Sequence, residues 1–174
     1  MIFGKLKPSF RAQNIYGVDW HDAWEKGYRG MILDIDNTLV PHDAPADEKS
    51  RAFLAALLEN GWKLMVLSNN REERAASFCT VCGIPWISDA KKPRPDAYRK
   101  AVSQMDLAKD RVICVGDQLF TDIWGANNAG LCSLLTDPVA PASDKWWIKL
   151  KRVLEFPIKH LHNVEITSKI TKDF

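Results

Sequence analysis

Short runs of apolar residues alternate along the chain with longer segments in which apolar residues recur at every third or fourth position. The short runs predict buried strands, and the longer segments predict amphipathic helices. Strands are expected at 30–35, 63–68, 84–88, 111–115 and 131–135. Helices are expected at 48–60, 70–83, 95–105, 120–128 and 143–156.

Regular alternation of strands and helices is typical of βαβ units, whose right-handed crossovers place helices on both faces of a parallel sheet. The predicted fold class is therefore α/β, a doubly wound and mostly parallel sheet of five strands. We expect residues 1–174 to form a single domain, because the length suits one core. Residues 1–29 are expected to be a lead-in segment that Trp20, Trp24 and Tyr28 attach to this core.

Several residues mark the expected helix boundaries. Asp47 is a candidate N-cap for the first long helix, and Gly61 follows its end. Asn70 with Glu73 three positions later has the pattern of a capping box. Pro95 suits the first position of the next helix.

Composition narrows the class of protein. With 46% hydrophobic and 26% charged residues, the chain is ordinary for a soluble globular protein. The net charge of +2 is not that of a general nucleic-acid binder, so no nucleic-acid partner is expected. We find no secretory signal and no apolar run of the ~20 residues that span a bilayer, and we expect the four cysteines to be reduced thiols in a cytoplasmic protein.

Two carboxylates follow the strand expected at 30–35. Asp34 and Asp36 are two positions apart, which in a strand places both side chains on one face. Close carboxylates repel each other unless a proton or a cation intervenes, and Mg²⁺ prefers such oxygen ligands. An alternative is a simple turn that closes the strand, which Asn37 and Thr38 would suit.

Other polar residues follow the later strands. Ser68 and Asp117 end two of them, and Lys92 lies in the loop after a third. Each residue taken alone is more often structural, as a turn hydroxyl, a solvated lysine or a strand-ending turn. Since the carboxyl ends of parallel strands meet at one edge, we expect them to converge with the acid pair. Such a set suits phosphoryl transfer through a covalent aspartyl intermediate.

These segments resemble, in order, the four motifs of the haloacid dehalogenase superfamily of phosphatases: DIDNT at 34–38, LSNN at 67–70, KP at 92–93 and GDQLFTD at 116–122. The resemblance implies that Asp34 is the nucleophile and that Asp36 is the general acid and base. It also implies a Mg²⁺ site formed by Asp34, Asp36 (through its backbone carbonyl), Asp117 and Asp122, the last directly or through water.

The resemblance further implies that Ser68, Asn69 and Lys92 bind the phosphate. Receiver domains of response regulators share this geometry, but their phosphorylated aspartate ends a later strand.

More closely, the chain resembles the YqeG-like branch of subclass IIIA. The resemblance covers about residues 6–136, and this branch includes phosphatidylglycerophosphate phosphatases. The intervals between motifs leave no room for a cap domain, which implies an open site and a bulky substrate or a lid from another subunit.

The segment 143–156 predicts an amphipathic helix that bears on the substrate. Its apolar positions, including Trp146 and Trp147, form a stripe roughly 120° wide at 100° per residue. Packing on the sheet explains this stripe, but an interfacial helix at a membrane has the same pattern. Peripheral membrane contact therefore stays open as an alternative to packing on the core.

Three functions are consistent with the sequence. The first is Mg²⁺-dependent hydrolysis of phosphatidylglycerophosphate through an aspartyl phosphate. The second is the same chemistry on a soluble nucleotide or sugar phosphate. The third is a non-catalytic membrane- or partner-binding protein, against which the intact set of acids, serine and lysine argues.

Overall fold

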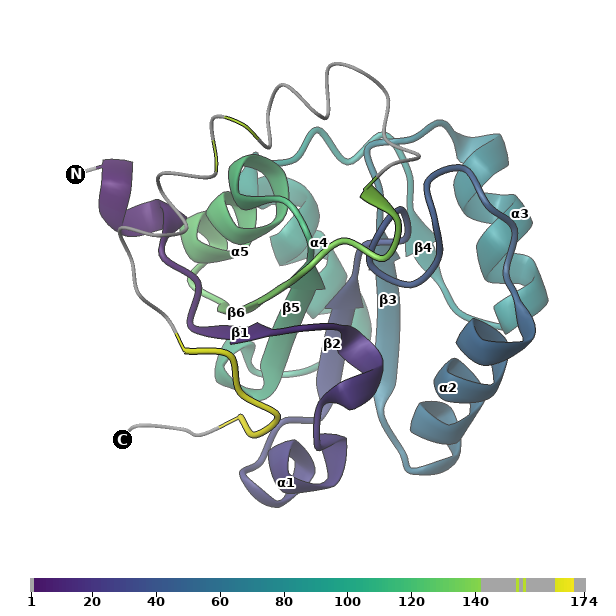
Figure 1. Ribbon diagram of the computed structural model, residues 1–174, viewed down its shortest axis with the longest axis horizontal. Helices are drawn as coiled ribbons and strands as arrows, with labels where there is room; N and C mark the ends of the chain where they lie inside the picture. The colour runs from purple at the N-terminus through teal and green to yellow at the C-terminus, as the bar shows by residue number, and fades with distance from the viewer. Residues whose placement is uncertain (1, 142–152, 154, 156–164, 171–174) are drawn as a thin grey trace.

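The computed structural model describes residues 2–141, 153, 155 and 165–170. Its centre is one sheet of six parallel strands in the spatial order β1-β6-β5-β2-β3-β4 (Figure 1). The strands are β1 (Phe10–Ala12), β2 (Gly30–Leu33), β3 (Lys63–Leu67), β4 (Trp86–Ile87), β5 (Val112–Gly116) and β6 (Cys132–Thr136). The predicted α/β class is confirmed, with six strands in place of the five expected.

The sixth strand comes from the segment that was expected to be only a lead-in. β1 pairs with β6 from Phe10 opposite Leu134 to Ala12 opposite Thr136. Three residues are too short to give an alternating pattern, so only the pairing with β6 reveals this strand. The far end of the chain then covers its outer edge, because Thr167 N–H donates to Arg11 O at 2.8 Å.

Five α-helices lie in the described part of the chain. They are α1 (Trp20–Glu25), α2 (Glu48–Glu59), α3 (Glu72–Cys82), α4 (Pro95–Met105) and α5 (Trp124–Ala129). Asp47 caps α2 as predicted, in a reciprocal capping box with Ser50. The helix expected at 143–156 lies outside the described residues, apart from positions 153 and 155, which are helical.

Alternation along the central strands divides the core into two layers. Met31 and Leu33 of β2 pack in the layer that includes Leu54 of α2 and Phe78 of α3. Ile32, between them in sequence, packs in the layer that includes Tyr98 of α4. Because strand side chains point alternately to opposite faces, both faces of the sheet need helices. The expected doubly wound arrangement is therefore confirmed.

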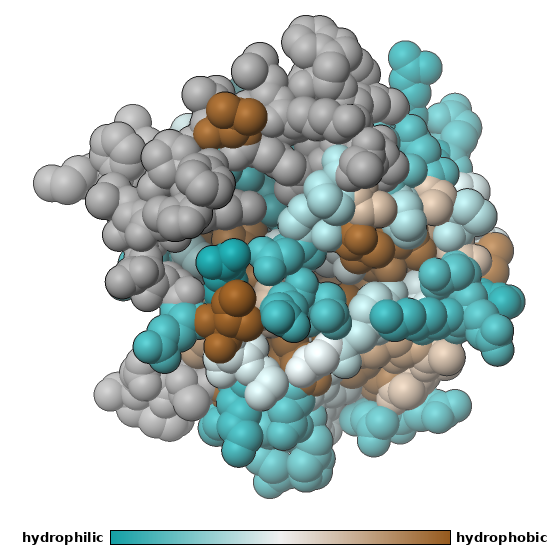
Figure 2. All heavy atoms as spheres, viewed as in Figure 1, coloured by the Kyte–Doolittle hydropathy of each residue, from teal (hydrophilic) through white to brown (hydrophobic). Residues whose placement is uncertain are grey.

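The surface in the view of Figure 2 is mainly hydrophilic over its described part, with hydrophobic residues in separate spots. The large hydrophobic side chains exposed in the described ranges belong to different segments: Leu58, Val81, Val139, Val153 and Ile166. Scattered apolar residues of this kind are normal on a protein surface. Among the described helices, none has the length and apolar character that crossing a membrane requires.

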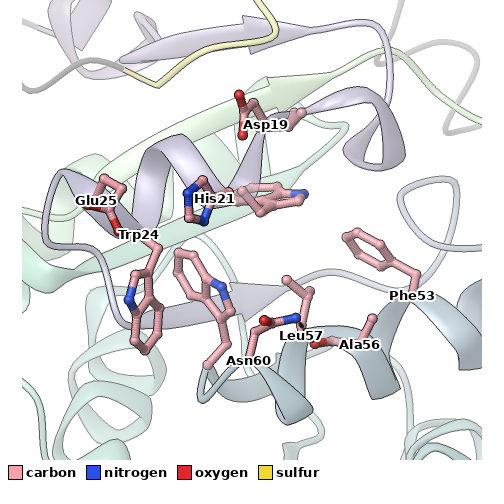
Figure 3. Close-up of a pocket in the computed structure, with 11 residues that line it drawn as sticks. Asp19, His21, Trp24, Glu25, Phe53, Ala56, Leu57 and Asn60 are labelled. Atoms are coloured by element: carbon pink, nitrogen blue, oxygen red, sulfur yellow. Dashed lines mark hydrogen bonds between the residues drawn. The ribbon is translucent and has the colours of Figure 1, made fainter.

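A cavity of about 500 Å³ lies between α1 and α2. Figure 3 shows Trp24 of α1 directed toward α2, with Leu57 and Asn60 on the opposite wall. Trp62 also lines it and leads into the amino end of β3. The cavity is therefore at the amino edge of the sheet, whereas doubly wound folds bind ligands at the carboxyl edge.

Candidate active site

The polar residues singled out in the sequence follow the carboxyl ends of the central strands. Asp34 comes directly after β2, Ser68 after β3, and Asp117 after β5. β2 ends at Leu33 rather than at 35, because Ile35 O accepts the N–H groups of Thr38, Leu39 and Val40 and turns the chain. Since the three strands are adjacent and parallel, these loops lie at one edge.

Lys92 lies at the centre of this edge. Its Nζ donates to Asp34 Oδ1 at 2.6 Å and to Asp122 Oδ1 at 2.7 Å, and its side chain is only 4% exposed. Burial lowers the pKa of Lys92, but Asp122 and Asp34 outweigh this effect and hold the pKa well above its usual value. The lysine is therefore a fixed positive charge among carboxylates.

The carboxylates of Asp34, Asp117 and Asp122 lie within 4.8 Å of one another. Burial raises the pKa of Asp34 well above its usual value, with Lys92 acting against this shift and Asp122 and Asp117 adding to it. Three acids against one lysine leave an excess of negative charge in a buried space. Carboxylate oxygens are the ligands that a hard cation such as Mg²⁺ prefers, so this set fits a magnesium ion.

The segment between Asp117 and α5 differs from the sequence prediction. A helix was expected at 120–128, but Leu119–Ile123 forms a single π-helical turn before α5 begins at Trp124. This turn lets Asp122 Oδ2 accept the N–H of Gln118 at 3.1 Å while Oδ1 reaches Lys92. Single π-turns occur frequently at functional sites, where they redirect side chains.

Tyr98 of α4 supports the π-helical turn that carries Asp122. Its hydroxyl is directed at the carbonyl oxygens of Thr121 and Asp122, at 3.1 and 3.3 Å. A Cβ added at Gly125 would come within 2.4 Å of the Tyr98 ring, so only glycine permits this approach. The sequence signals neither contact, because position 98 has the helical spacing of an ordinary core residue.

Gly116 is expected to be required for the placement of Asp122. A Cβ at position 116 would lie 2.4 Å from both Cβ and Cγ of Asp122. Gly116→Ala should therefore displace Asp122 and weaken activity. It should also lower the free energy of unfolding by about 1–3 kcal/mol, and with it the melting temperature. Thermal unfolding measures the first effect. Gly4→Ala is the control, since nothing lies within 4 Å of its added Cβ; equal stability of the two variants would contradict this close contact.

Asp36 belongs to a different cluster from the three acids around Lys92. Its Oδ1 accepts the Asp43 N–H at 3.0 Å and Arg74 Nη2 at 2.8 Å, and its Oδ2 accepts the Asn70 amide. His42 Nδ1 lies 3.8 Å from Oδ2. The group of Asp36, His42 and Asp43 is separate from the group of Asp34, Asp117 and Asp122.

The capping box expected at Asn70 and Glu73 is wrong. α3 begins at Glu72 with Arg71 as N-cap, and no side chain makes a capping hydrogen bond there. The reason is that the Asn70 side chain donates to Asp36 instead, while Asn70 N–H donates to Ser68 Oγ at 3.1 Å. Asn70 thus connects two loops of the site.

Asn69 contacts the main chain of Lys92 through both ends of its amide. Its Oδ1 accepts Lys92 N–H at 2.7 Å, and its Nδ2 donates to Lys92 O at 3.2 Å. The paired bonds fix the loop that carries the lysine to the loop after β3. Ser68, the other residue of this loop expected to bind phosphate, is buried at 2% exposure.

Sequence reasoning did not single out Thr38, Asn70, Arg74 or His42 as contacts of the site acids. Thr38 Oγ1 is 3.4 Å from Asp117 Oδ1. Arg74 lies in the first turn of α3, and Asn70 lies just before the N-cap of that helix. Both contact Asp36 in the folded chain, and no local sequence pattern signals these contacts.

Comparison with known proteins identifies the family. A family model of haloacid dehalogenase-like hydrolases matches residues 39–130. The protein named Probable phosphatase YqeG of Bacillus subtilis is 36% identical over 149 residues, which are 85% of this chain and 86% of YqeG. The chain belongs to the haloacid dehalogenase-like hydrolases, and within them to the phosphatases.

More distant relatives agree with this family. The chloroplastic phosphatidylglycerophosphate phosphatase 1 of Chlamydomonas reinhardtii is 25% identical over 85% of this chain, which spans 59% of the algal protein. A crystal structure of an uncharacterized Corynebacterium glutamicum protein matches 81% of this chain and 99% of its own, with a TM-score of 0.53 and 24% identity. A hydrolase structure from Streptococcus pneumoniae also has a TM-score of 0.53, at 13% identity, over 74% of this chain and 99% of its own. These two structures show the same fold.

Proposed function

We propose that this phosphatase hydrolyses a phosphomonoester through an aspartyl phosphate on Asp34. The observation that carries the proposal is the Lys92 ammonium, held 2.6 Å from Asp34 Oδ1 among buried acids. Lys92 directs one Asp34 oxygen and supplies positive charge where the phosphoryl oxygens gather charge in the transition state. Residues 1–174 are proposed to act as one domain in this reaction.

The first step breaks the bond between phosphorus and the leaving oxygen. An Asp34 oxygen attacks phosphorus, and Asp36 donates a proton to the departing alkoxide, which leaves as an alcohol. In the second step Asp36 takes a proton from water, and the oxygen of that water attacks phosphorus. Asp34 then departs as a free carboxylate and inorganic phosphate is the second product.

The phosphate contacts are proposed to come from two loops. Ser68 Oγ and Lys92 Nζ are the donors expected to face the phosphoryl oxygens. Asn69, which we expected to bind phosphate, has its amide directed at the backbone of Lys92. We therefore propose that the Asn69 side chain acts on the phosphate through the position of Lys92.

The metal expected at this site is Mg²⁺. Asp34, Asp117 and Asp122 would hold it with their carboxylates, and Asp36 through its backbone carbonyl, as the sequence resemblance implies. When bound, the ion offsets the repulsion between the acids and the phosphate dianion and polarises the phosphoryl oxygens. Thr38 keeps Asp117 oriented through its hydroxyl at 3.4 Å.

The proposed substrate class is a bulky phosphate ester, with phosphatidylglycerophosphate as the specific candidate. Between Asp36 and Ser68 the structure has α2 and β3, and between Ser68 and Lys92 it has α3 and β4, with no inserted domain in either described interval. Such a site is open to a large ester. The similarity to the algal phosphatidylglycerophosphate phosphatase supports the lipid, and a soluble nucleotide or sugar phosphate is the alternative.

Phosphate release should depend on Mg²⁺ and should be highest on the favoured ester. The test compares phosphatidylglycerophosphate in mixed micelles with soluble nucleotide and sugar phosphates, with Mg²⁺ and with excess EDTA. We expect activity to disappear in EDTA and to return when Mg²⁺ is added back. A preference for the lipid would support the specific candidate and the peripheral membrane contact, whereas a preference for a soluble ester would reject both. Activity that persists in EDTA would reject the metal site.

A non-catalytic binding role is the remaining alternative. It predicts that the purified protein releases no phosphate from any ester but still binds vesicles that contain anionic lipid. The segment on which such binding would depend, 143–156, lies mostly outside the described residues. The intact arrangement of Lys92 with Asp34 and Asp122 favours the enzyme.

A further inference from the structure

Arg74 forms an ion pair with Asp36 that no sequence motif indicated. Its Nη2 donates to Asp36 Oδ1 at 2.8 Å, and the two side chains are only 15% and 10% exposed. The guanidinium lies over the buried ring of Phe78, at 5.8 Å from the ring centroid. Water therefore screens this pair less than a surface pair, and the core of the protein limits where the guanidinium can lie.

Donors surround the Asp36 carboxylate, and they come from two different segments. Asp43 N–H reaches Oδ1 from the loop after β2, and the Asn70 amide reaches Oδ2 from just before α3. Arg74 is the donor that belongs to a helix and carries a permanent charge. Arg74 is itself held in place, because it belongs to α3 and its guanidinium lies over Phe78. It can therefore hold the Asp36 carboxylate in one position.

The ion pair has a single contact rather than a paired one. Arg74 Nη2 reaches one oxygen of Asp36, and Arg74 Nε–H has no hydrogen-bond acceptor in the part of the chain that the structure describes. The other oxygen, Oδ2, accepts the Asn70 amide, so Arg74 and Asn70 together hold both oxygens of the carboxylate. This arrangement fixes the orientation of the Asp36 carboxylate.

We propose that Arg74 is a positioning residue that orients Asp36 for proton transfer to the leaving group. The proposal rests on the proposed function, in which Asp36 is the acid and base. Arg74 acts through Asp36 and does not need to contact the phosphate. Its loss should therefore affect the reaction in proportion to the need for a proton on the leaving oxygen.

The test compares leaving groups. Arg74→Ala should lose on the order of 10–10²-fold in kcat/KM on a simple alkyl phosphate, the scale of a catalytic group moved out of place. On 2,4-dinitrophenyl phosphate, whose leaving group departs without a proton, the loss in kcat/KM should stay within about threefold, because kcat/KM covers only the steps up to release of the leaving group and no general acid is needed there. Arg74→Lys, which keeps a charged donor, should restore most of the alkyl phosphatase activity.

Arg99→Ala is the matched control. Arg99 is an exposed arginine on α4 whose nearest carboxylate, that of Asp96, is 3.7 Å away. This variant should match the wild type on both esters. An equal loss on both esters in Arg74→Ala would overturn the positioning role, because a purely structural defect does not depend on the leaving group. So would an undiminished loss when Arg74→Ala is added to an Asp36→Asn background.

A measurement without substrate separates this inference from the proposed function. Melting temperatures are compared for Arg74→Ala, Asp36→Asn and the double variant. If Arg74 holds Asp36, the shifts should not add, and Arg74→Ala should change the melting temperature much less in the Asp36→Asn background. Additive shifts would overturn the inference even for an active enzyme. A wild type that releases no phosphate would overturn the proposed function, while non-additive shifts would still support the hold on Asp36.

Discussion

Replacing Asp34 with asparagine is expected to abolish phosphate release. In the structure, Lys92 Nζ donates to Asp34 Oδ1 at 2.6 Å. Asparagine keeps the shape of the side chain and an oxygen that can accept this hydrogen bond. The amide is not a nucleophile, so the phosphoryl group has no acceptor on the enzyme. We expect a loss on the order of 10⁴-fold or more, the scale that follows removal of a catalytic nucleophile.

The measurement is Mg²⁺-dependent phosphate release from the best ester in the panel, together with acid-quench trapping of the phosphorylated protein. The wild type should carry a hydroxylamine-sensitive acyl phosphate, and Asp34→Asn should carry none. Asp96→Asn is the control, because Asp96 is an exposed acid in the first turn of α4. Asp34→Asn activity close to that of the control would falsify the nucleophile assignment.

Lys92→Ala is expected to lower kcat by about 10²–10³-fold, as removal of one charged contact to the transition state does. The structure adds a second expected effect. Without Lys92, the carboxylates of Asp34 and Asp122 lose their common donor while they remain buried. Uncompensated buried charge is destabilising by about 3–5 kcal/mol, so the melting temperature should fall as well.

Added Mg²⁺ should recover part of that lost stability, because a cation offsets the repulsion that the missing lysine leaves. Kinetics and thermal unfolding are therefore measured with and without the ion. Lys91→Ala is the control, since Lys91 is exposed and has no ion pair within the described ranges. If Lys92→Ala kept both the activity and the melting temperature of this control, Lys92 would have no part in the site.

Much of the fold followed from local patterns. The apolar runs at 63–68 and 111–115 became the buried strands β3 and β5, and Asp47 capped α2. These predictions succeeded because a buried strand or a capped helix depends mainly on its own residues. β1 was missed because three residues carry no period, and its pairing partner β6 lies more than a hundred positions away.

For the candidate site, too, the sequence determined some features and the tertiary structure decided the others. The sequence by itself determined which residue types follow the strands, and the parallel order then required Asp34, Ser68 and Asp117 to share an edge. It could not determine side-chain orientation, because that depends on groups from distant segments. The tertiary structure decided that Asn69 contacts the Lys92 backbone and that Asn70 contacts Asp36 rather than capping α3.

The tertiary structure also decided which acids act together. The two-residue spacing predicted that the side chains of Asp34 and Asp36 share one face, so it gave no reason to separate them. In the structure, Lys92 contacts Asp34, and Arg74 contacts Asp36. The physical reason is that a turn begins directly after β2, so the two carboxylates meet different neighbours. Spacing in the sequence fixes direction only within a regular strand, and beyond its end the contacts of the folded chain decide.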